Sequence, residues 1–225
     1  MIVYGKNVAK EVLSNNIKIN KVIVANNFSD KELLQNLKKY NIFYMDKKIM
    51  DKKYEGNHQG IVLEIEDFKY EKLDTLYDKN FVVILDHLED PHNLGAIVRT
   101  CEAFGVSGII IPENRSVSVN ETVMKTSVGT LYNVKISQVT NLNNTIKRLK
   151  KDGYWIYGTD MDGEDFKKVK YPDKTVVIIG NEGSGLSRIV RNSCDSIVKI
   201  PMYGKVNSLN ASVATAIIVN EVINR

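Results

Sequence analysis

The feature that most constrains this fold is a series of short apolar runs between residues 81 and 225, separated by segments with helical spacing. The run Phe81–Leu85 is apolar at every position, which is typical of a strand buried on both faces of a sheet. Further strands are expected at Gly108–Ile111, near Val134, and at Tyr154–Gly158, Thr175–Gly180 and Ser196–Ile200. Strands of this kind that alternate with helices predict an α/β fold with a parallel sheet.

Helical spacing fills the segments between these runs. Helices are expected at about Asn93–Phe104, Asn120–Thr126, Leu142–Lys151 and Asn210–Ile223, with a short one before Ser196. Asn93 is placed to cap the first of them, and Gly105 to end it in the left-handed conformation. The last helix is apolar nearly all the way round, so we expect it to be buried on more than one side. One side can face the sheet and the other a partner subunit.

The first 67 residues form a smaller α/β unit in this interpretation. A helix is expected at Lys6–Leu13 and another after Asp30, which can cap it; strands are expected at Lys21–Ala25, Asn41–Tyr44 and Ile61–Ile65. Residues 68–80 are charged and poorly periodic, which indicates a linker with room for one helical turn. The predicted division is therefore 1–67, a linker at 68–80, and a domain at 81–225.

Composition excludes some classes of protein and leaves others open. The net charge of +4 is compatible with binding to nucleic acid but does not require it. The two cysteines, Cys101 and Cys194, make no disulfide framework and fit a reducing, cytoplasmic setting. His58, His87 and His92 show no metal-ligand spacing. The chain begins with no signal peptide, and its apolar runs are too short to cross a membrane.

The first loop with functional residue types runs from Asp86 to Asn93 and leads into the helix that carries Arg99. Small residues lie one turn from Arg99, at Gly95, Ala96 and Ala103, and they leave open space around its side chain. A bulky ligand could lie over the arginine there. The alternative is a surface arginine that pairs with Glu102. Spacing alone favours the surface arginine, because exposed arginines are common on helices.

Two further loops follow expected strands. Gly180–Leu186 is rich in glycine, but it matches neither the dinucleotide fingerprint nor the phosphate-binding loop. Glu182 would repel a pyrophosphate, yet it could accept hydrogen bonds from a sugar or a base; a plain glycine turn is the alternative. The third loop, Ile200–Asn210, offers Ser208 and Asn210 as helix caps, but it is long and polar for a cap alone.

Taken together, these loops resemble a known family. The segments DPHNLGAIVRTCEAFG, IIGNEGSGLS and IPMYGKVNSLNASVATAI, in this order, resemble the three motifs of the SpoU-type ribose 2′-O-methyltransferases, which belong to the SPOUT class. This match covers about residues 80–225. VYGKNVAKEVL, KVIVA and HQGIVLEI resemble the small RNA-recruiting domain found before many such catalytic domains. That domain is similar to certain ribosomal proteins that bind bent RNA.

The resemblance implies a fold, a cofactor and an assembly. It implies a parallel sheet whose C-terminal segment is threaded into a trefoil knot, and a homodimer in which the last helix gains its second buried face. It implies that S-adenosylmethionine is the cofactor, without a metal. The cofactor would be held by backbone groups near Gly180, Ile200 and Leu209.

The resemblance also implies catalytic residues. It assigns the positioning of the ribose and the path of its proton to Asn93, Arg99, Glu182, Ser208 and Asn210. All five are present, which argues against an inactive relative. Arginine is an awkward proton acceptor because its guanidinium hardly ever deprotonates in proteins. Holding a substrate phosphate and the 2′-oxygen is the easier role for Arg99.

The expected reaction is methyl transfer to a ribose 2′-hydroxyl of RNA. Relatives with this front domain often modify a guanosine of large-subunit (23S) ribosomal RNA, so the resemblance favours that substrate. It implies no binding to DNA or to a membrane. A guanosine of transfer RNA and an adenosine of ribosomal RNA remain alternatives. A non-catalytic RNA-binding factor for ribosome assembly, with the same fold, is a further one. A nicotinamide-dependent dehydrogenase is disfavoured because its glycine fingerprint is missing.

Overall fold

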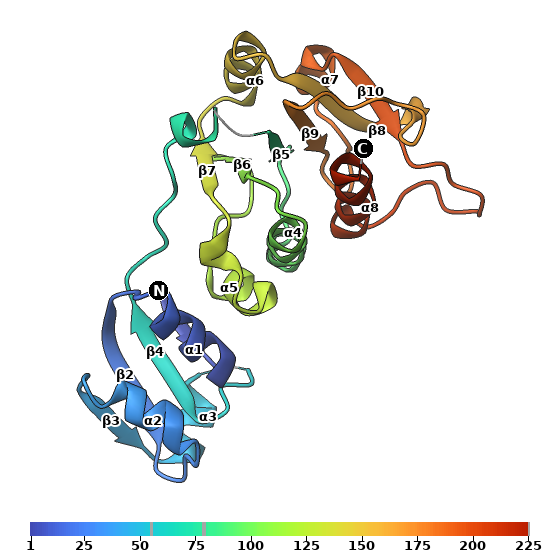
Figure 1. Ribbon diagram of the computed structural model, residues 1–225. Helices are drawn as coiled ribbons and strands as arrows, with labels where there is room; N and C mark the ends of the chain where they lie inside the picture. The colour runs from blue at the N-terminus through green and yellow to red at the C-terminus, as the bar shows by residue number, and fades with distance from the viewer. Residues whose placement is uncertain (55, 78–79, 225) are drawn as a thin grey trace. The chain divides into compact units, whose positions relative to one another are not determined.

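The computed structural model describes residues 1–54, 56–77 and 80–224, and their contacts divide them into two compact units (Figure 1). The first unit comprises residues 1–69 and 119–132. The second comprises residues 70–118 and 133 to the C-terminal end. Both are built from strands and helices, as the α/β prediction requires.

The first unit is built on a four-stranded sheet in the order β1-β4-β2-β3. Its strands are β1 (Ile2–Tyr4), β2 (Ile19–Ala25), β3 (Ile42–Met45) and β4 (Ile61–Ile65). β4 is antiparallel to both of its neighbours, whereas β2 and β3 are parallel. A buried cluster that includes Ile23, Met50 and Val62 packs against the sheet. The small α/β unit expected from the sequence is therefore present.

Three helices of the first unit follow its strands in the chain: α1 (Lys6–Ser14), α2 (Lys31–Leu37) and α3 (Lys47–Lys53). The Asp30 side chain accepts a hydrogen bond from the Leu33 amide at 3.1 Å, which confirms it as the cap of α2. β1 and α3 were not among the expected elements. β1 has only three residues, and α3 buries only Met50 fully, so neither carries a periodic apolar pattern.

One helix lies in a different unit from its neighbours in sequence. α5 (Glu121–Ser127) follows β6 in the chain, but it packs with the first unit and contacts β1. Val123 and Met124 are its buried apolar residues. The division by contacts thus differs in this segment from the division by sequence, which kept residues 81–225 together. A domain predicted from the sequence consists of consecutive residues. In the folded chain, an apolar helix face can instead pack with residues that are distant in the sequence.

The predicted linker contains the single turn expected of it, η1 (Leu73–Leu76). Leu76 is fully buried in the core of the second unit. Residues 78–79 of the linker, as well as Glu55 and Arg225, lie outside the described residues. The part of residues 68–77 that follows Lys69 therefore belongs to the second unit and contributes a core residue to it.

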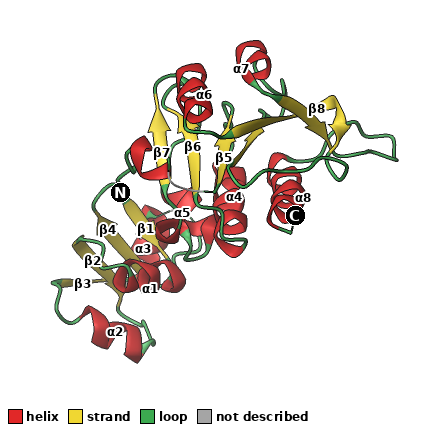
Figure 2. Cartoon of the chain, turned by 45° about the horizontal axis from the view of Figure 1, so that its top comes forward, coloured by secondary structure: helices red, strands yellow, loops and turns green. Residues whose placement is uncertain are grey.

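The second unit is built on a six-stranded sheet in the order β10-β8-β9-β5-β6-β7, parallel throughout (Figure 2). The strands are β5 (Phe81–Leu85), β6 (Gly108–Pro112), β7 (Ile136–Val139), β8 (Trp155–Asp165), β9 (Thr175–Ile179) and β10 (Ser196–Lys199). Every residue of β5, β6 and β9 is buried, as expected of strands covered on both faces. The prediction of a parallel α/β sheet is confirmed.

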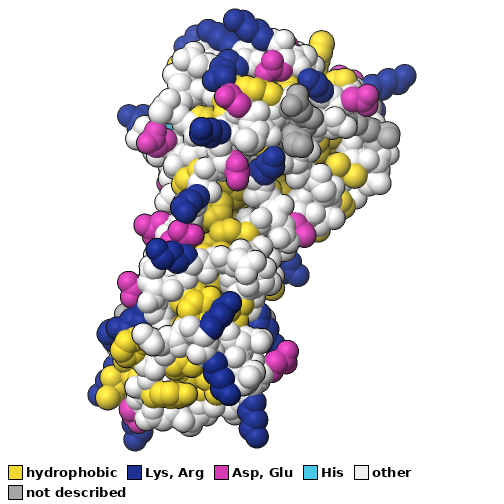
Figure 3. All heavy atoms as spheres, turned by 60° about the vertical axis from the view of Figure 1, so that its left-hand side comes forward, with side chains coloured by type: hydrophobic (Ala, Val, Ile, Leu, Met, Phe, Trp, Pro, Cys, Tyr) yellow, Lys and Arg dark blue, Asp and Glu magenta, His cyan; other side chains and the backbone are white. Residues whose placement is uncertain are grey.

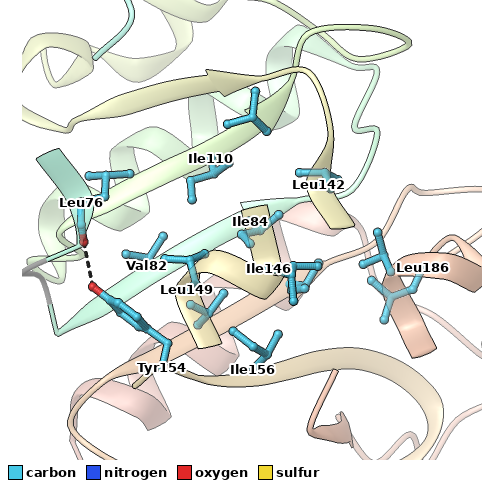
Figure 4. Close-up of a cluster of buried hydrophobic side chains, with 14 residues drawn as sticks. Leu76, Val82, Ile84, Ile110, Leu142, Ile146, Leu149, Tyr154, Ile156 and Leu186 are labelled. Carbon is cyan, nitrogen blue, oxygen red and sulfur yellow. Dashed lines mark hydrogen bonds between the residues drawn. The ribbon is translucent and has the colours of Figure 1, made fainter. Parts of the chain in front are cut away.

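Helices cover both faces of this sheet (Figure 2). α4 (Pro91–Ala103) packs against α8 (Ala211–Ile223) on one face, and α6 (Leu142–Lys151) packs against α7 (Arg188–Ser193) on the other. Leu94, Ile97, Val98 and Cys101 are fully buried along α4, which confirms its apolar stripe. Figure 4 shows the cluster packed between α6 and the sheet, where the Tyr154 hydroxyl donates to the Leu76 carbonyl at 2.7 Å.

The start of α4 corrects one prediction. Asp90, not Asn93, is its N-cap: the Asp90 side chain accepts a hydrogen bond from the His92 amide at 2.9 Å. Pro91 occupies the first helical position, where its missing N–H costs nothing. Asn93 is therefore the third residue of the helix, and its side chain is available for contacts outside α4. At the other end Gly105 follows with φ +70°, as expected of a left-handed cap.

Candidate active site at the carboxyl edge of the parallel sheet

The candidate site lies where the order of strands reverses. From β5 the chain builds outward through β6 and β7, and it then crosses to the opposite side of the sheet for β8, β9 and β10. β5 and β9 are neighbours at this switch point, beyond which ligands bind in open α/β sheets. The loops that follow these two strands are joined there, because the Asn181 side chain donates to the His87 carbonyl at 2.8 Å.

Three of the five expected catalytic residues form a hydrogen-bonded chain at this edge. The Asn93 Nδ2 donates to Glu182 Oε1 at 2.7 Å, and the Asn210 Nδ2 donates to Asn93 Oδ1 at 2.9 Å. Asn210 also caps α8, since its Oδ1 accepts from the Ser212 amide at 2.9 Å. α4 and the loops before α7 and α8 thus each supply one member.

Ser208 and Arg99 lie outside this hydrogen-bonded chain. Both side chains are exposed, and no hydrogen bond or ion pair joins either to another residue of the described chain. The surface ion pair between Arg99 and Glu102 is therefore not formed. Glu102 instead accepts a hydrogen bond from Asn133 at 3.3 Å. The guanidinium of Arg99 is left available to a ligand.

A cavity of about 330 Å³ lies beside the hydrogen-bonded chain. The three residues expected to hold a cofactor, Gly180, Ile200 and Leu209, all line it, together with Glu182 and Ser208. α8 contributes an apolar wall. A cavity of this volume, with apolar and polar side chains both in its lining, is suited to a small ligand.

The glycine loop that borders the cavity has no room for a side chain at Gly180. A Cβ atom there would lie 2.6 Å from the Leu186 amide nitrogen and 2.7 Å from the Gly185 carbonyl oxygen. Asn181 closes the loop by exchanging two backbone hydrogen bonds of 3.0 Å with Gly185. Its side-chain oxygen also accepts from the Gly183 amide at 2.9 Å. The loop backbone therefore packs against itself and forms a closed rim.

Sequence reasoning missed one wall of the cavity. Thr159, Asp160 and Met161 line it from β8, beyond the expected strand end at Gly158. Arg191 holds Asp160 at 3.3 Å and Asp162 at 2.7 Å. The available signal was positional: residues just after a predicted parallel strand lie at the ligand-binding edge of the sheet.

Among the described residues, no three His, Cys, Asp or Glu side chains are grouped so that they could hold a metal ion. No helix in residues 1–54, 56–77 and 80–224 is long and apolar enough to cross a membrane.

The fold and the site define an α/β protein with a small-ligand cavity at the carboxyl edge of a parallel sheet and an additional small α/β unit. Comparison with known families gives the identification. The model described as "SpoU rRNA Methylase family" matches residues 80–220, and the chain belongs to this family. A second model, described as "RNA 2'-O ribose methyltransferase substrate binding", matches residues 2–71. The resemblance found in the sequence is confirmed.

Relatives of known name match the whole chain. A protein of Bacillus subtilis named putative TrmH family tRNA/rRNA methyltransferase YacO is 40% identical over 236 residues, covering 99% of this chain and 95% of its own length. A Staphylococcus saprophyticus protein with the same family name is 38% identical and covers 100% of this chain and 96% of its own. This chain is therefore an RNA methyltransferase of the TrmH/SpoU family.

Solved structures share the fold. The SpoU methyltransferase AviRb from Streptomyces viridochromogenes, crystallised with AdoMet, has a TM-score of 0.86 at 23% identity and covers 100% of this chain and 89% of its own. An AdoMet-bound rRNA methyltransferase from Sinorhizobium meliloti has a TM-score of 0.83 at 23% identity, with 99% and 86% covered. The A. aeolicus TrmH/SpoU tRNA modifying enzyme is 33% identical with a TM-score of 0.59, over 68% and 81%.

Proposed function

We propose that this protein transfers the methyl group of S-adenosylmethionine to a ribose 2′-hydroxyl of RNA. The observation that carries the proposal is the hydrogen-bonded chain of Asn93, Glu182 and Asn210 beside the cavity lined by Gly180, Ile200 and Leu209. Two methyltransferases crystallised with AdoMet share this fold. The substrate-binding match of residues 2–71 names a ribose 2′-O activity.

The residues of the cavity fit the cofactor. Glycine at 180 lets the loop backbone close on itself beside the cavity, because a Cβ atom there would lie 2.6 Å from the Leu186 amide nitrogen, and the closed loop keeps its backbone groups at the cavity wall. Backbone groups near Gly180, Ile200 and Leu209 would hold the adenosine part. When bound, S-adenosylmethionine supplies an electrophilic methyl group on a sulfonium. Glu182 gives the site a carboxylate that suits this positive charge.

The residues around the cavity have two tasks in this proposal. The 2′-hydroxyl must lose its proton as it accepts the methyl group, so the enzyme must position the ribose and provide a route for that proton. Asn93 donates directly to the Glu182 carboxylate at 2.7 Å, and Asn210 donates to Asn93 at 2.9 Å. Together they hold the carboxylate in one orientation. Ser208 lines the cavity with an exposed hydroxyl. Arg99 holds a phosphate of the target nucleotide, because its planar fork matches phosphate geometry.

RNA recruitment is the proposed role of the first unit. A polar cavity of about 450 Å³ lies there, lined by Lys6, Lys47, Phe28 and Gln59 among others. Two segments that resemble the recruiting domain meet in it, since Gln59 Oε1 accepts a hydrogen bond from the Lys6 amide at 2.9 Å. Lysines beside a half-buried aromatic ring suit the phosphates and bases of RNA.

The surface of the first unit supports the same role. Phe43 and Tyr44 on β3 are 51% and 64% exposed, and Lys21 lies 4.8 Å from the centre of the Phe43 ring. Figure 3 shows hydrophobic side chains and basic side chains gathered together on the visible face of this unit. Bases can stack on exposed aromatic rings, while lysines neutralise phosphates.

The proposed substrate is a guanosine of 23S ribosomal RNA. It rests on the resemblance of the first unit to recruiting domains of enzymes with that substrate. The relatives themselves are named for both tRNA and rRNA.

The proposed assembly is a homodimer that buries α8. One side of this helix packs against α4, while Val213 and Ile223 on other sides are 47% and 41% exposed. Exposed apolar side chains on a helix that is only partly buried are typical of a subunit interface.

The experiment that tests the function is a map of ribose methylation across total RNA. RNA from cells with the gene deleted is compared with RNA from cells that carry the wild-type protein or the Glu182→Gln variant. Loss of one 2′-O-methyl mark in 23S rRNA on deletion, restored by the wild type alone, supports the proposal. A mark lost from tRNA contradicts the proposed substrate. No lost mark contradicts the enzymatic role and favours a non-catalytic RNA-binding factor.

A further inference from the structure

A second cavity lies at the same edge of the parallel sheet, and none of the residues that line it lines the cofactor cavity. Its volume is about 680 Å³. It is bordered by the segments that follow β5, β6 and β7 and by the first residues of α6 and α7. His87, Arg115, Asn143, Ser187 and Ile189 are among the residues that line it. All of them belong to the second unit.

A buried carboxylate holds two sides of this cavity in place. Asp86 is 1% exposed, and its Oδ1 lies 2.6 Å from the Nδ1 of His87. Its Oδ2 accepts a hydrogen bond from the Ser187 amide at 2.7 Å. Because Asp86 engages Nδ1, the Nε2 atom of the half-exposed His87 ring is the one available to a ligand.

Two residues of the cavity adopt an uncommon backbone conformation. His87 has φ +59° and Arg115 has φ +55°, both in the left-handed region that non-glycine residues seldom occupy. Such residues persist only where the surrounding structure imposes them, and they gather at ligand-binding sites. Their occurrence on two different loops of one cavity indicates that both side chains are held there for a ligand.

The side chains present suit a nucleotide. Arg115 is exposed and has no ion pair within the described chain, so its guanidinium is available to an anion. The nearest carboxylate in sequence, Glu113, does not line the cavity. Ile189 on α7 is 65% exposed and offers an apolar surface to a base. Arginine and imidazole together favour a phosphate, and the apolar surface favours the base attached to it.

We propose that this cavity binds the RNA nucleotide next to the methylated one, with its phosphate on Arg115 and His87 and its base against Ile189. The inference rests on the proposed function. A hydrogen bond joins the linings of the two cavities, because Asn181 lines the cofactor cavity and donates at 2.8 Å to the carbonyl of His87, which lines the second cavity. The segments that follow the neighbouring strands β5 and β9 each line one of the two cavities, so in this proposal one strand of RNA that crosses this edge of the sheet passes from one cavity to the other.

The test compares RNA binding by the full-length Arg115→Asn protein and the wild type. Asparagine adopts the left-handed conformation more readily than most residues, so this change removes the guanidinium without adding backbone strain. A short single-stranded RNA of mixed sequence is the probe, titrated over a range of salt concentrations. We expect affinity to fall about tenfold, and the slope of log K against log salt to decrease by about 0.7, the value for one lost phosphate contact on a single strand.

Lys147→Gln is the matched control, because Lys147 is an exposed cation on α6 that does not line the cavity. We expect its RNA affinity to stay within about twofold of the wild type. Equal losses in both variants, or wild-type affinity in Arg115→Asn, would overturn the inference. Inorganic phosphate that competes fully with RNA at this site would also overturn it, because the ligand would then be a free anion.

Two readouts separate this inference from the proposed function. S-adenosylmethionine affinity, measured by calorimetry, should be unchanged in Arg115→Asn. If the wild type binds RNA through Arg115 but transfers no methyl group, the proposed function fails and the inference stands. If Arg115→Asn binds RNA normally and still methylates it, the inference fails and the proposed function stands.

Discussion

At the scale of single residues, Asn93 shows how the start of a helix decides what a side chain can do. Because Asp90 caps α4, the Asn93 amide is not needed as a cap. Its side chain instead forms hydrogen bonds with Glu182 and Asn210, which are 89 and 117 residues further along the chain. Both ends of its amide are engaged, one as donor and one as acceptor, so only one orientation of the side chain satisfies the network.

The first prediction concerns Arg99. Arg99→Ala should lower single-turnover methylation by on the order of a hundredfold or more, because positioning and proton handling both act at the transition state. Affinity for S-adenosylmethionine should change little, since Arg99 does not line the cofactor cavity. Arg99→Lys keeps the charge but loses the planar fork, so it should rescue poorly.

A thermal melt of the same variants is the control for Arg99. Its side chain is exposed and makes no ion pair with another described residue, so the melting temperature should stay near that of the wild type. Turnover like that of the wild type in Arg99→Ala would remove this residue from the mechanism.

The second prediction concerns Gly180. Gly180→Ala should abolish detectable S-adenosylmethionine binding by calorimetry, because the new Cβ would lie 2.6 Å from the Leu186 amide nitrogen and force the loop apart. Gly204→Ala is the control. Gly204 does not line the cofactor cavity, and a Cβ there meets nothing within 4 Å, so binding should be largely retained. Equal binding by both variants would show that the packing of this loop does not control the cofactor site.

At the scale of elements, α1 carries a buried acid that makes a testable contribution to stability. Glu11 is 4% exposed, and burial raises its pKa from 4.5 to about 7, although the amides of Leu131 and Gly129 act in the opposite direction. A raised pKa means that the folded state favours the protonated acid. Stability should therefore decline as pH rises from 4.5 through 7, and level off above.

Glu11→Gln removes this ionisation. We expect the variant to be more stable than the wild type by about 1–2 kcal/mol at pH values above 7, and nearly equal to it below 4.5. Urea denaturation across this pH range measures the difference. Glu32→Gln, at an exposed position on α2, is the control and should not change the pH profile. A stability difference between Glu11→Gln and wild type that does not vary with pH would contradict the prediction.

α8 provides the prediction about assembly. Val213→Glu should convert a homodimer to a monomer at micromolar concentration, because a charge would be buried in the proposed interface without a partner. Light scattering measures the mass. Ile49→Glu is the matched control, since Ile49 is 57% exposed on α3 in the other unit. A wild-type protein that scatters only as a monomer would contradict the proposed dimer.

At the scale of the whole molecule, the two units have separate proposed tasks. The combined change Lys6→Gln and Lys47→Gln in the polar cavity of the first unit should raise KM for RNA by on the order of tenfold, because phosphate contacts are lost. The kcat at saturating RNA and the affinity for S-adenosylmethionine should be unchanged. Lys31→Gln, exposed and outside that cavity, is the control. A fall in kcat with no change in KM would refute the recruiting role.

Point substitutions suit this test better than removal of the first unit. Residues 119–132 lie within the sequence of the methyltransferase family match but pack with residues 1–69. A protein that began near Asn80 would leave the buried face of α5 without its partner, in particular Val123 and Met124. Loss of activity in such a protein could then result either from the loss of RNA recruitment or from the loss of stability.

The sequence by itself determined the local elements of this protein. Phe81–Leu85 is a buried strand and Leu142–Lys151 is a helix, with the same bounds as predicted. These elements follow from apolar periodicity, which is a local property of the chain. The family motifs also named residues that the structure brings together, because Asn93, Glu182 and Asn210 share one network. The trefoil knot stays a prediction.

Only the tertiary structure decided where these elements meet. β8 runs on to Asp165 without apolar alternation, because Gly163 lets the β10 backbone approach: a Cβ there would lie 2.6 Å from the Val198 carbonyl carbon. β1 exists through pairing with β4, and α5 packs away from its sequence neighbours. Pairing and burial between distant segments depend on the free energy of the whole fold, which no local pattern encodes.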